Sequence, residues 1–188
     1  MAELAAYGLW LFWLVTWGIA ALWSAPITKQ PAWGMRLAHR LVLVVGIFLL
    51  FGILSPRHMA LTSLWHMPER WKWAMDGAIT AGIAIAWWAR ITLGKFWSAD
   101  VARKQDHKVI ESGPYALVRH PIYTGLLISA FATAAIEGTL LAWAGAVLMT
   151  ASWYWKARQE EDFLRAELGP AYDDYAGRVA MLVPFLTL

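Results

Sequence analysis

The sequence contains no cysteine among its 188 residues. Disulfide frameworks, thiolate metal sites and a cysteine nucleophile are therefore excluded. No Gly-x-Gly spacing occurs, so the chain carries neither a Rossmann fingerprint nor a P-loop. Charged residues are also scarce, at 15%, whereas 60% of the residues are hydrophobic and 14 are tryptophan. This composition is too apolar for an ordinary soluble domain and predicts a membrane protein.

Hydropathy predicts five membrane-spanning helices. The first covers Leu4–Trp23; it lacks the basic start of a signal peptide, and its roughly 20 residues are enough to cross about 30 Å of hydrocarbon. Two further spans are expected at residues 35–54 and 73–93. A longer apolar stretch, 122–155, is interrupted at 137–138 by Glu-Gly. This interruption favours a tight turn between two helices of a hairpin, and a single bent helix is the alternative.

Basic residues are distributed unequally between the two predicted sides. With five spans, the segments 24–40 and 90–120 and the tail from residue 156 share one side. That side carries 13 of the 16 lysines and arginines: Lys29, Arg36, Arg40, Arg90, Lys95, Arg103, Lys104, Lys108, Arg119, Lys156, Arg158, Arg165 and Arg178. The other side carries Arg57, Arg70 and Lys72. The positive-inside rule therefore predicts an outer amino terminus and a cytoplasmic tail, and the net charge of +3 reflects topology rather than nucleic-acid binding.

A polar box, GPYALVRHPIYTG at residues 113–125, precedes the predicted fourth span. Pro121 suits the first turn of a helix, where its missing N–H is no loss. Arg119 and His120 then lie beside free backbone N–H groups, which attract carboxylates and other anions. Alternatively, Arg119 reaches lipid phosphates and His120 only caps the helix.

The predicted fifth helix runs on into a second polar cluster, which lies on the same predicted side. It comprises Glu160, Glu161 and Asp162, and Tyr172 and Tyr175 lie one turn apart on a short helix expected after Gly-Pro. Arg119, His120 and these carboxylates can meet in one pocket. By spacing alone, a solvated charge run explains the tail equally well.

Three motifs together resemble the isoprenylcysteine carboxyl methyltransferase family: LGKFWSA at 93–99, HKVIESGPYALVRHPIYTG at 107–125 and QEEDFLRAELGPAYDDYAGRV at 159–179. Related phospholipid methyltransferases carry a similar core. The resemblance covers roughly the last 95 residues. It implies an all-α, polytopic integral membrane protein with about five spans, of a size typical of prokaryotic members, and hence an inner-membrane location. We expect one domain over residues 1–188, with three spans in 1–93 and a cofactor-binding core in 94–188.

The resemblance also implies a cytoplasmic pocket for S-adenosylmethionine, closed by the C-terminal helix, with S-adenosylhomocysteine as product and no metal. The matching cofactor positions are His107, Tyr115, Arg119, His120, Tyr123, Glu160, Glu161, Tyr172 and Tyr175, with Trp97 and Ser98 as weaker additions. Arg119, His120 and Glu161 are the candidate catalytic residues. Chemically, a glutamate suits the cofactor's ammonium, Arg119 or the helix start suits its carboxylate, and aromatic rings suit the adenine or the sulfonium.

For the methyl acceptor, the resemblance implies a prenylcysteine carboxylate in the membrane, with Lys156, Arg158 and Trp153 as candidate substrate contacts. Eukaryotic members often have arginine where this chain has Lys156, and a lysine lacks the bidentate fork. A phospholipid amine or another small lipophilic amine or thiol therefore stays open as the acceptor. A carboxylate needs no base, whereas an amine or thiol must first lose a proton, for which His120 or Glu161 is available.

Two other functions fit the same residues. A membrane reductase would bind NADPH through basic residues such as Arg103, Lys104 and Lys108, and a noncatalytic lipid-binding bundle would bind neither cofactor. Membrane lipids are expected neighbours in every case, and the sequence leaves the oligomeric state open.

Overall fold

The computed structural model describes residues 1–22, 33–53, 63–94, 97 and 109–186. The described residues form helices and contain no strand, as the predicted all-α fold requires. In chain order the helices are α1 (Ala2–Ala21), α2 (Trp33–Leu50), α3 (Glu69–Leu93), the 3-10 turn η3 (Gly113–Ala116), α4 (Pro121–Glu137), α5 (Leu140–Leu168) and α6 (Pro170–Arg178).

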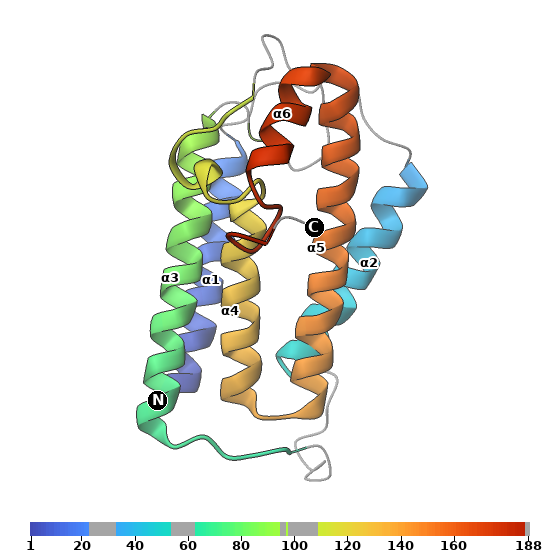
Figure 1. The fold of residues 1–188 in the computed structure, drawn as a ribbon. Coiled ribbons are helices and arrows are strands. Elements are labelled where there is room, and N and C mark those ends of the chain that lie inside the picture. The colour runs from blue at the N-terminus through green and yellow to red at the C-terminus, as the bar shows by residue number, and fades with distance from the viewer. Residues whose placement is uncertain (23–32, 54–62, 95–96, 98–108, 187–188) are drawn as a thin grey trace.

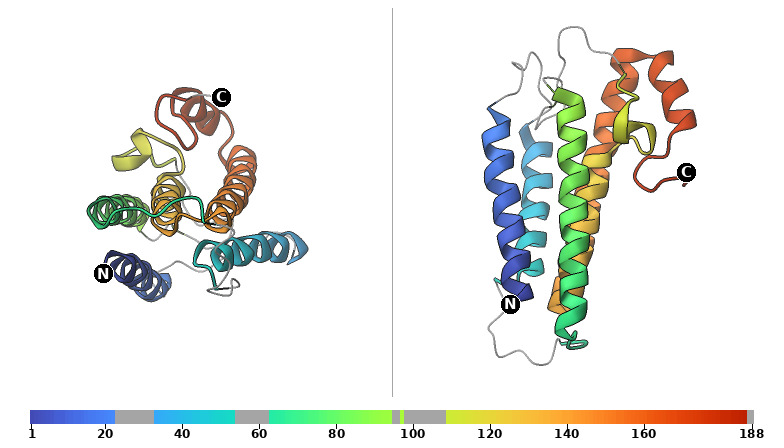
Figure 2. Two further views of the ribbon diagram at one scale, coloured as in Figure 1. Left: turned by 90° about the horizontal axis from the view of Figure 1, so that it is seen from below. Right: turned by 90° about the vertical axis from the view of Figure 1, so that its left-hand side faces the viewer.

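The five long helices form an upright bundle with α4 at its centre (Figure 1). Viewed from the end, α4 lies between α3 and α5, while α1 and α2 cover one side (Figure 2). The pairs α3–α4 and α2–α5 make the most extensive contacts. Helix α6 and η3 lie together at the end of the bundle opposite the amino terminus, so the polar box and the acidic tail meet there.

Small residues allow the central helices to approach closely. Gly82 of α3 faces Gly125 of α4, and a Cβ added to either one would collide with the backbone oxygen of the other. Buried alanines of α3, α4 and α5 continue this contact, among them Ala86, Ala130 and Ala146. The close packing fixes the start of α4, and with it the position of the polar box.

Gly82→Ala is expected to destabilise the protein by about 1–3 kcal/mol, because the added methyl group overpacks the α3–α4 contact. Gly77→Ala on the same helix is the matched control, since nothing lies within 4 Å of a Cβ built there and alanine favours a helix over glycine. Thermal unfolding in detergent measures both variants. Equal unfolding midpoints for the two would contradict the packing contact.

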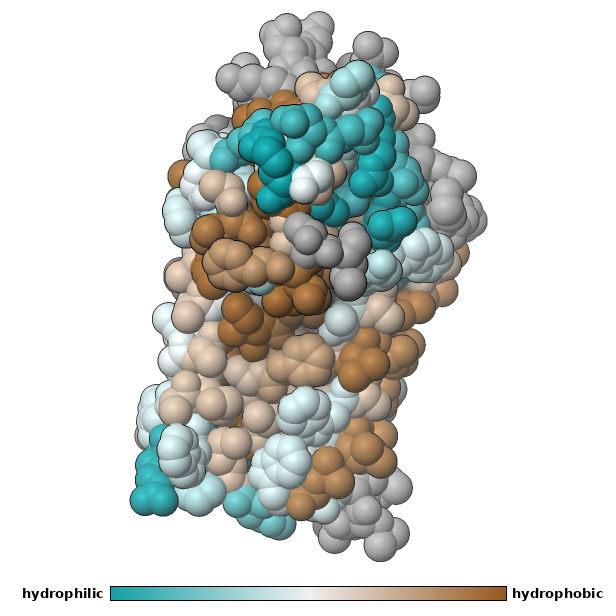
Figure 3. Space-filling view, in the orientation of Figure 1, coloured by the Kyte–Doolittle hydropathy of each residue, from teal (hydrophilic) through white to brown (hydrophobic). Residues whose placement is uncertain are grey.

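The outer surface of the bundle is apolar, with exposed large hydrophobic side chains on every long helix. Figure 3 shows this apolar surface below a hydrophilic cap formed around α6 and the end of α5. Among the described helices, α1 has both the length and the apolar composition to cross a membrane, and α4 is apolar but shorter. Helix α3 is long enough, but charged residues at both ends lower its hydropathy: Glu69, Arg70, Lys72, Asp76 and Arg90.

The long apolar stretch folds as two helices that meet at the predicted break. Gly138 ends α4 in the left-handed conformation, which favours glycine, and Thr139 caps α5 by accepting a hydrogen bond from the Ala142 N–H at 3.1 Å. Helix α5 then continues for 29 residues, about 43 Å, well beyond the apolar segment. Its polar second half therefore carries Glu160 and Glu161 to the level of the polar box.

Candidate functional site

The chain entering α4 is held by the segment that follows α6. The Arg119 N–H donates to the Ala180 carbonyl at 2.8 Å, and the His120 N–H donates to the Met181 carbonyl at 3.1 Å. Val118 and Ala180 form an isolated parallel bridge. The C-terminal segment thus satisfies the backbone groups just before the helix start and fixes the direction of the Arg119 and His120 side chains.

Arg119 and Glu161 form a buried ion pair. Arg119 Nε lies 2.6 Å from Glu161 Oε1, and the two side chains are 7% and 0% exposed. The Arg119 Nη1 group donates to the carbonyls of Ala176 and Val179. One guanidinium therefore joins the box before α4, the carboxylate of α5 and the end of α6, although these segments are far apart in the sequence.

His120 lies between the two glutamates. Its Nε2 is 3.3 Å from Glu161 Oε1 and its Nδ1 is 3.5 Å from Glu160 Oε2. Glu160 also accepts a hydrogen bond from the Tyr123 hydroxyl at 2.7 Å and lies 3.9 Å from Lys156 Nζ. The His120 and Tyr123 rings stack with their centroids 5.7 Å apart. The pattern is a compact network of alternating charge.

Burial disfavours the charged form of each of these groups, but their mutual contacts outweigh it. The hydrogen bonds to Glu160 and Glu161 raise the pKa of His120 above its ordinary value. Hydrogen bonds from His120 and Arg119 lower the pKa of Glu161 to about 2, and the bond from His120 and the charge of Lys156 lower the pKa of Glu160. Near pH 6 the cluster therefore holds two carboxylates and an imidazolium.

This cluster predicts a stability optimum in mildly acidic solution. The glutamates stabilise the fold above their ordinary pKa near 4.5, and this contribution is lost as the pH falls through their lowered values. Protonated His120 stabilises it below its ordinary pKa of 6.5, and this contribution is lost as the pH rises through the raised value. Thermal midpoints from pH 3 to 9 should fall at both ends. His120→Gln should abolish the alkaline decline, and an unchanged decline would contradict the assignment.

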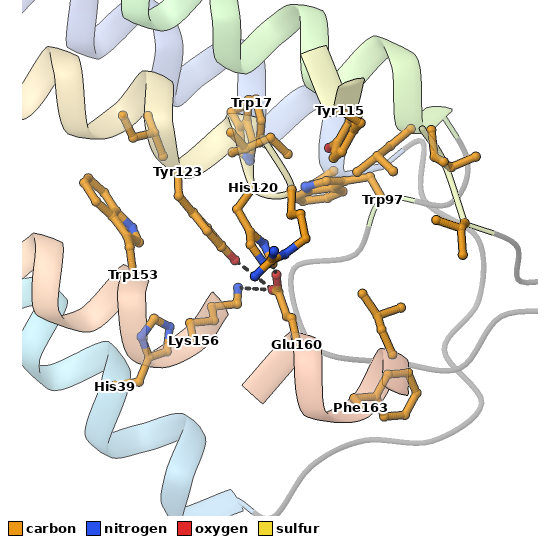
Figure 4. Close-up of a pocket in the computed structure, with 18 of the residues that line it drawn as sticks. Trp17, His39, Trp97, Tyr115, His120, Tyr123, Trp153, Lys156, Glu160 and Phe163 are labelled. Atoms are coloured by element: carbon orange, nitrogen blue, oxygen red, sulfur yellow. Dashed lines mark hydrogen bonds and ion pairs between the residues drawn. The ribbon is translucent and has the colours of Figure 1, made fainter. Parts of the chain in front are cut away.

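A cavity of about 480 Å³ opens beside the cluster (Figure 4). Its polar wall consists of Tyr115, Arg119, His120, Tyr123, Lys156, Glu160, Tyr172 and Tyr175. Its apolar wall includes Trp13, Leu14, Trp17, Leu43, Trp97, Ile122, Leu126 and Trp153. The cavity therefore joins a charged, aromatic compartment to an apolar one that extends between α1, α2, α4 and α5.

Helix α6 lies against the polar compartment and contributes Tyr172 and Tyr175 to its wall. The Tyr175 hydroxyl donates to the Tyr115 carbonyl at 2.7 Å, which ties α6 to η3. Tyr172 and Tyr175 are buried and pack with Val109 and Leu164. Their rings form a wall against which a planar group can stack.

Two of the predicted site residues lie outside the cavity wall. Glu161 was expected to contact ligand; in the structure it is fully buried and pairs with Arg119. Arg158 was expected to contact the substrate but is exposed on the outer face of α5. Successive helical residues turn by about 100°, so Glu161 and Arg158, one and two residues away from Glu160, point in other directions than Glu160, which faces the cavity. His107 and Ser98 lie outside the described residues.

The sequence reasoning missed the part of the wall formed by the first two helices. Trp13 and Trp17 of α1 and His39 and Leu43 of α2 line the cavity. Each pair is spaced four residues apart, which places both members on one helix face. Within its apolar helix, His39 is also an ionisable residue, which is itself a signal of function in a membrane segment. Among the described residues, no group of three or more His, Asp or Glu side chains could hold a metal ion.

Residues 75–166 match the sequence model of the isoprenylcysteine carboxyl methyltransferase (ICMT) family, a segment that contains the polar box and both glutamates. The chain belongs to the ICMT family. Membership of this family of membrane proteins supports an integral membrane location, as the apolar surface of the bundle does.

Two curated relatives illustrate the range of the family. The chain is 33% identical over 101 residues to protein-S-isoprenylcysteine O-methyltransferase B of Arabidopsis thaliana, covering 52% of this chain and 51% of that one. It is 30% identical over 164 residues to methanethiol S-methyltransferase of a Pseudomonas species, covering 82% and 61%. The chain thus spans about half to three fifths of the length of these relatives.

A solved structure shares the fold. It is described as the eukaryotic intramembrane Ras methyltransferase ICMT, and it matches with a TM-score of 0.52 at 20% identity over 81% of this chain and 52% of that one. The helical arrangement around the cavity is therefore the ICMT-like fold.

Proposed function

We propose that this protein is an S-adenosylmethionine-dependent methyltransferase acting on a lipophilic acceptor in the membrane. The observation that carries the proposal is the two-part cavity, because a charged, aromatic compartment meets an apolar one inside a single space. A cofactor with an ammonium, a carboxylate and an adenine suits the first compartment, and a lipid-like acceptor suits the second. The methyltransferase names of the relatives support the same reaction class.

The hydrogen-bond donors of Arg119 that the protein does not use suit the cofactor's carboxylate. A guanidinium has five N–H donors. Nε donates to Glu161 and Nη1 donates to the carbonyls of Ala176 and Val179, while Nη2 has no partner among the described residues. Because Arg119 lines the cavity, its two Nη2 donors are the ones available to a ligand carboxylate.

Glu160 and the tyrosines supply the other contacts. Glu160 is the carboxylate of the pair that lines the cavity, which suits an ammonium group, and Tyr172 and Tyr175 offer rings for the adenine or the sulfonium. When bound, S-adenosylmethionine supplies an electrophilic methyl group on a sulfonium. The protein's own task is to exclude water and align the acceptor with that methyl group.

The acceptor enters from the apolar compartment. A prenylcysteine carboxylate is one candidate, with Lys156 as a cation in the wall and Trp153 as an apolar contact. A lipophilic thiol is the second, and the thiol methyltransferase among the relatives favours it. We place the cofactor compartment on the cytoplasmic side and the amino terminus outside, in a prokaryotic inner membrane.

Calorimetric titration of the purified protein in nanodiscs with S-adenosylhomocysteine tests the proposal. Saturable binding at one site is expected. Binding of NADPH instead would indicate a reductase, and binding of neither would indicate a noncatalytic bundle. Isotopically labelled S-adenosylmethionine, incubated with the protein and lipid extracts, then identifies the methylated product by mass spectrometry.

Glu160→Gln is expected to weaken S-adenosylhomocysteine binding about 10- to 100-fold, because it removes a charge-assisted hydrogen bond to the ligand's ammonium worth about 1.5–3 kcal/mol. Asp162→Asn is the control, since Asp162 is 74% exposed on the outer face of α5. The same titration measures both variants. If both variants bound S-adenosylhomocysteine with the same affinity, Glu160 would not be a cofactor contact.

A further inference from the structure

His39 is a titratable group in the apolar compartment that the proposed cofactor contacts do not use. It lies on α2, lines the cavity and contacts Ser152 of α5, with 2.7 Å between His39 Nδ1 and Ser152 Oγ. The Ser152 hydroxyl is also 3.1 Å from the His39 backbone carbonyl, and Ser152 is only 1% exposed. The imidazole is thus held in place from one side.

The contacts of Ser152 select the tautomer of His39. A serine hydroxyl has one hydrogen to donate. Both contacts are hydrogen bonds at once only if the serine donates to the His39 carbonyl and accepts from an Nδ1–H group. A neutral imidazole with hydrogen on Nδ1 has a lone pair on Nε2. Nε2 has no partner within the part of the chain that the structure describes.

His39 lies next to the polar compartment. Ser152, Lys156 and Glu160 follow one another at intervals of four, so they form a stripe about 12 Å long on one face of α5. Figure 4 shows Lys156 between His39 and Glu160, with Trp153 beside the imidazole. The charged groups that act on the His39 ring are Lys156 and Glu160 from α5 and Arg40 from α2.

We infer that the methyl acceptor is a lipophilic thiol and that His39 Nε2 accepts its proton, an inference that rests on the proposed methyltransferase function. A thiol must become a thiolate to act as a nucleophile. A cysteine-type thiol, with a pKa near 8.5, is close enough to imidazole, near 6.5, for efficient proton transfer, whereas phenols and amines near 10 are poorly matched. A carboxylate acceptor is already deprotonated at neutral pH, so its methylation does not require His39 as a base.

The step balances without any further reactant. The electrons of the acceptor's S–H bond form the new bond from its sulfur to the methyl carbon. The carbon–sulfur bond of the sulfonium breaks, and its electrons leave S-adenosylhomocysteine neutral at sulfur. The proton passes to Nε2 and then to water. The products are a methyl thioether and S-adenosylhomocysteine.

The test compares two acceptors with the same acyl chain, N-dodecanoylcysteinamide, which has a cysteine-type thiol, and dodecanoate, using labelled S-adenosylmethionine and protein in nanodiscs. The wild type should methylate the thiol. His39→Gln should lower kcat for the thiol about 10²- to 10³-fold at pH 7, with KM and S-adenosylhomocysteine affinity unchanged. The deficit should shrink about tenfold per pH unit up to pH 8.5, because solvent then supplies the thiolate. Leu41→Ala, at a 56% exposed position on α2, controls for a general disturbance of that helix.

A second variant distinguishes the role of His39 as a base from its role in packing. Ser152→Ala keeps the imidazole but removes the group that selects its tautomer, so kcat should fall only about fivefold, the equivalent of one hydrogen bond. If the His39→Gln variant had the same kcat for the thiol as the wild type, or a deficit that did not change with pH, the role of His39 would be overturned. Methylation of dodecanoate but not of N-dodecanoylcysteinamide would overturn the thiol assignment and leave the methyltransferase function standing. A wild type that binds no S-adenosylhomocysteine would instead refute the proposed function, and this inference with it.

Discussion

Glu161→Ala should lower the free energy of unfolding by about 3–5 kcal/mol, because it leaves buried positive charge without its partner. Arg119 and His120 both contact Glu161 Oε1, at 2.6 and 3.3 Å, and neither side chain is more than 7% exposed. The lowered pKa of Glu161, about 2, corresponds to about 3 kcal/mol of stability at neutral pH, in agreement with this range. Denaturant titration in detergent, followed by circular dichroism, measures the loss.

The neighbouring residue provides the control for Glu161. Asp162 is 74% exposed and its contact with Arg165 is 3.8 Å, so Asp162→Ala should change stability by less than about 1 kcal/mol. Glu161→Gln preserves the shape of the side chain but removes its charge. Its loss of stability should therefore lie between those of Glu161→Ala and Asp162→Ala. Similar losses for Glu161→Ala and Asp162→Ala would show that the ion pair does not hold the site together.

Arg119→Lys should release the C-terminal segment while keeping the positive charge. A lysine ammonium is a point charge and cannot reproduce the planar fork that donates from Nε to Glu161 and from Nη1 to the carbonyls of Ala176 and Val179. Loss of two or three of these bonds costs about 3 kcal/mol, so opening of the segment should become roughly 100-fold more frequent. Hydrogen exchange at the amides of Arg119 and His120, which bond to that segment, reports this opening.

Arg178→Lys is the matched control for this variant. Arg178 contacts Glu111 and Asp174 on the surface, where such pairs contribute little. Its exchange pattern should therefore equal that of the wild type. Unchanged protection in Arg119→Lys would contradict the clamping role of Arg119.

Local signals in the sequence were sufficient to predict where α4 begins and ends. Gly138 stops one helix and Pro121 starts another through backbone preferences that do not depend on the rest of the fold. The end of α5 was harder to predict, because hydropathy marks only its apolar part. The predicted continuation of this helix into the polar segment is confirmed, because α5 runs without a break to Leu168.

The meeting of the polar box and the acidic tail was predicted from motif resemblance rather than from spacing. Arg119 and Glu161 are 42 residues apart, and only the packing of α4, α5 and α6 decides whether they meet. For the same reason the sequence could not distinguish the roles of Glu160 and Glu161. One faces the cavity and the other faces Arg119, and that difference depends on the rotation of α5 within the bundle.

The contribution of the first two helices was not predicted, although His39 in an apolar helix is a signal of function. Trp13 and Trp17 belong to an apolar segment whose side chains serve equally well for packing, lipid contact or ligand binding. The arrangement of α1 and α2 against α4 and α5 is what turns these side chains toward the cavity. The apolar compartment is thus a property of the assembled bundle.

A structure determined with S-adenosylhomocysteine bound tests the central claim most directly. We predict density for the ligand in the cavity beside Arg119, Glu160 and Tyr172, with its carboxylate at the guanidinium and its sulfur directed toward the apolar compartment. Density at another place in the bundle, or an empty cavity at a saturating ligand concentration, would contradict the account.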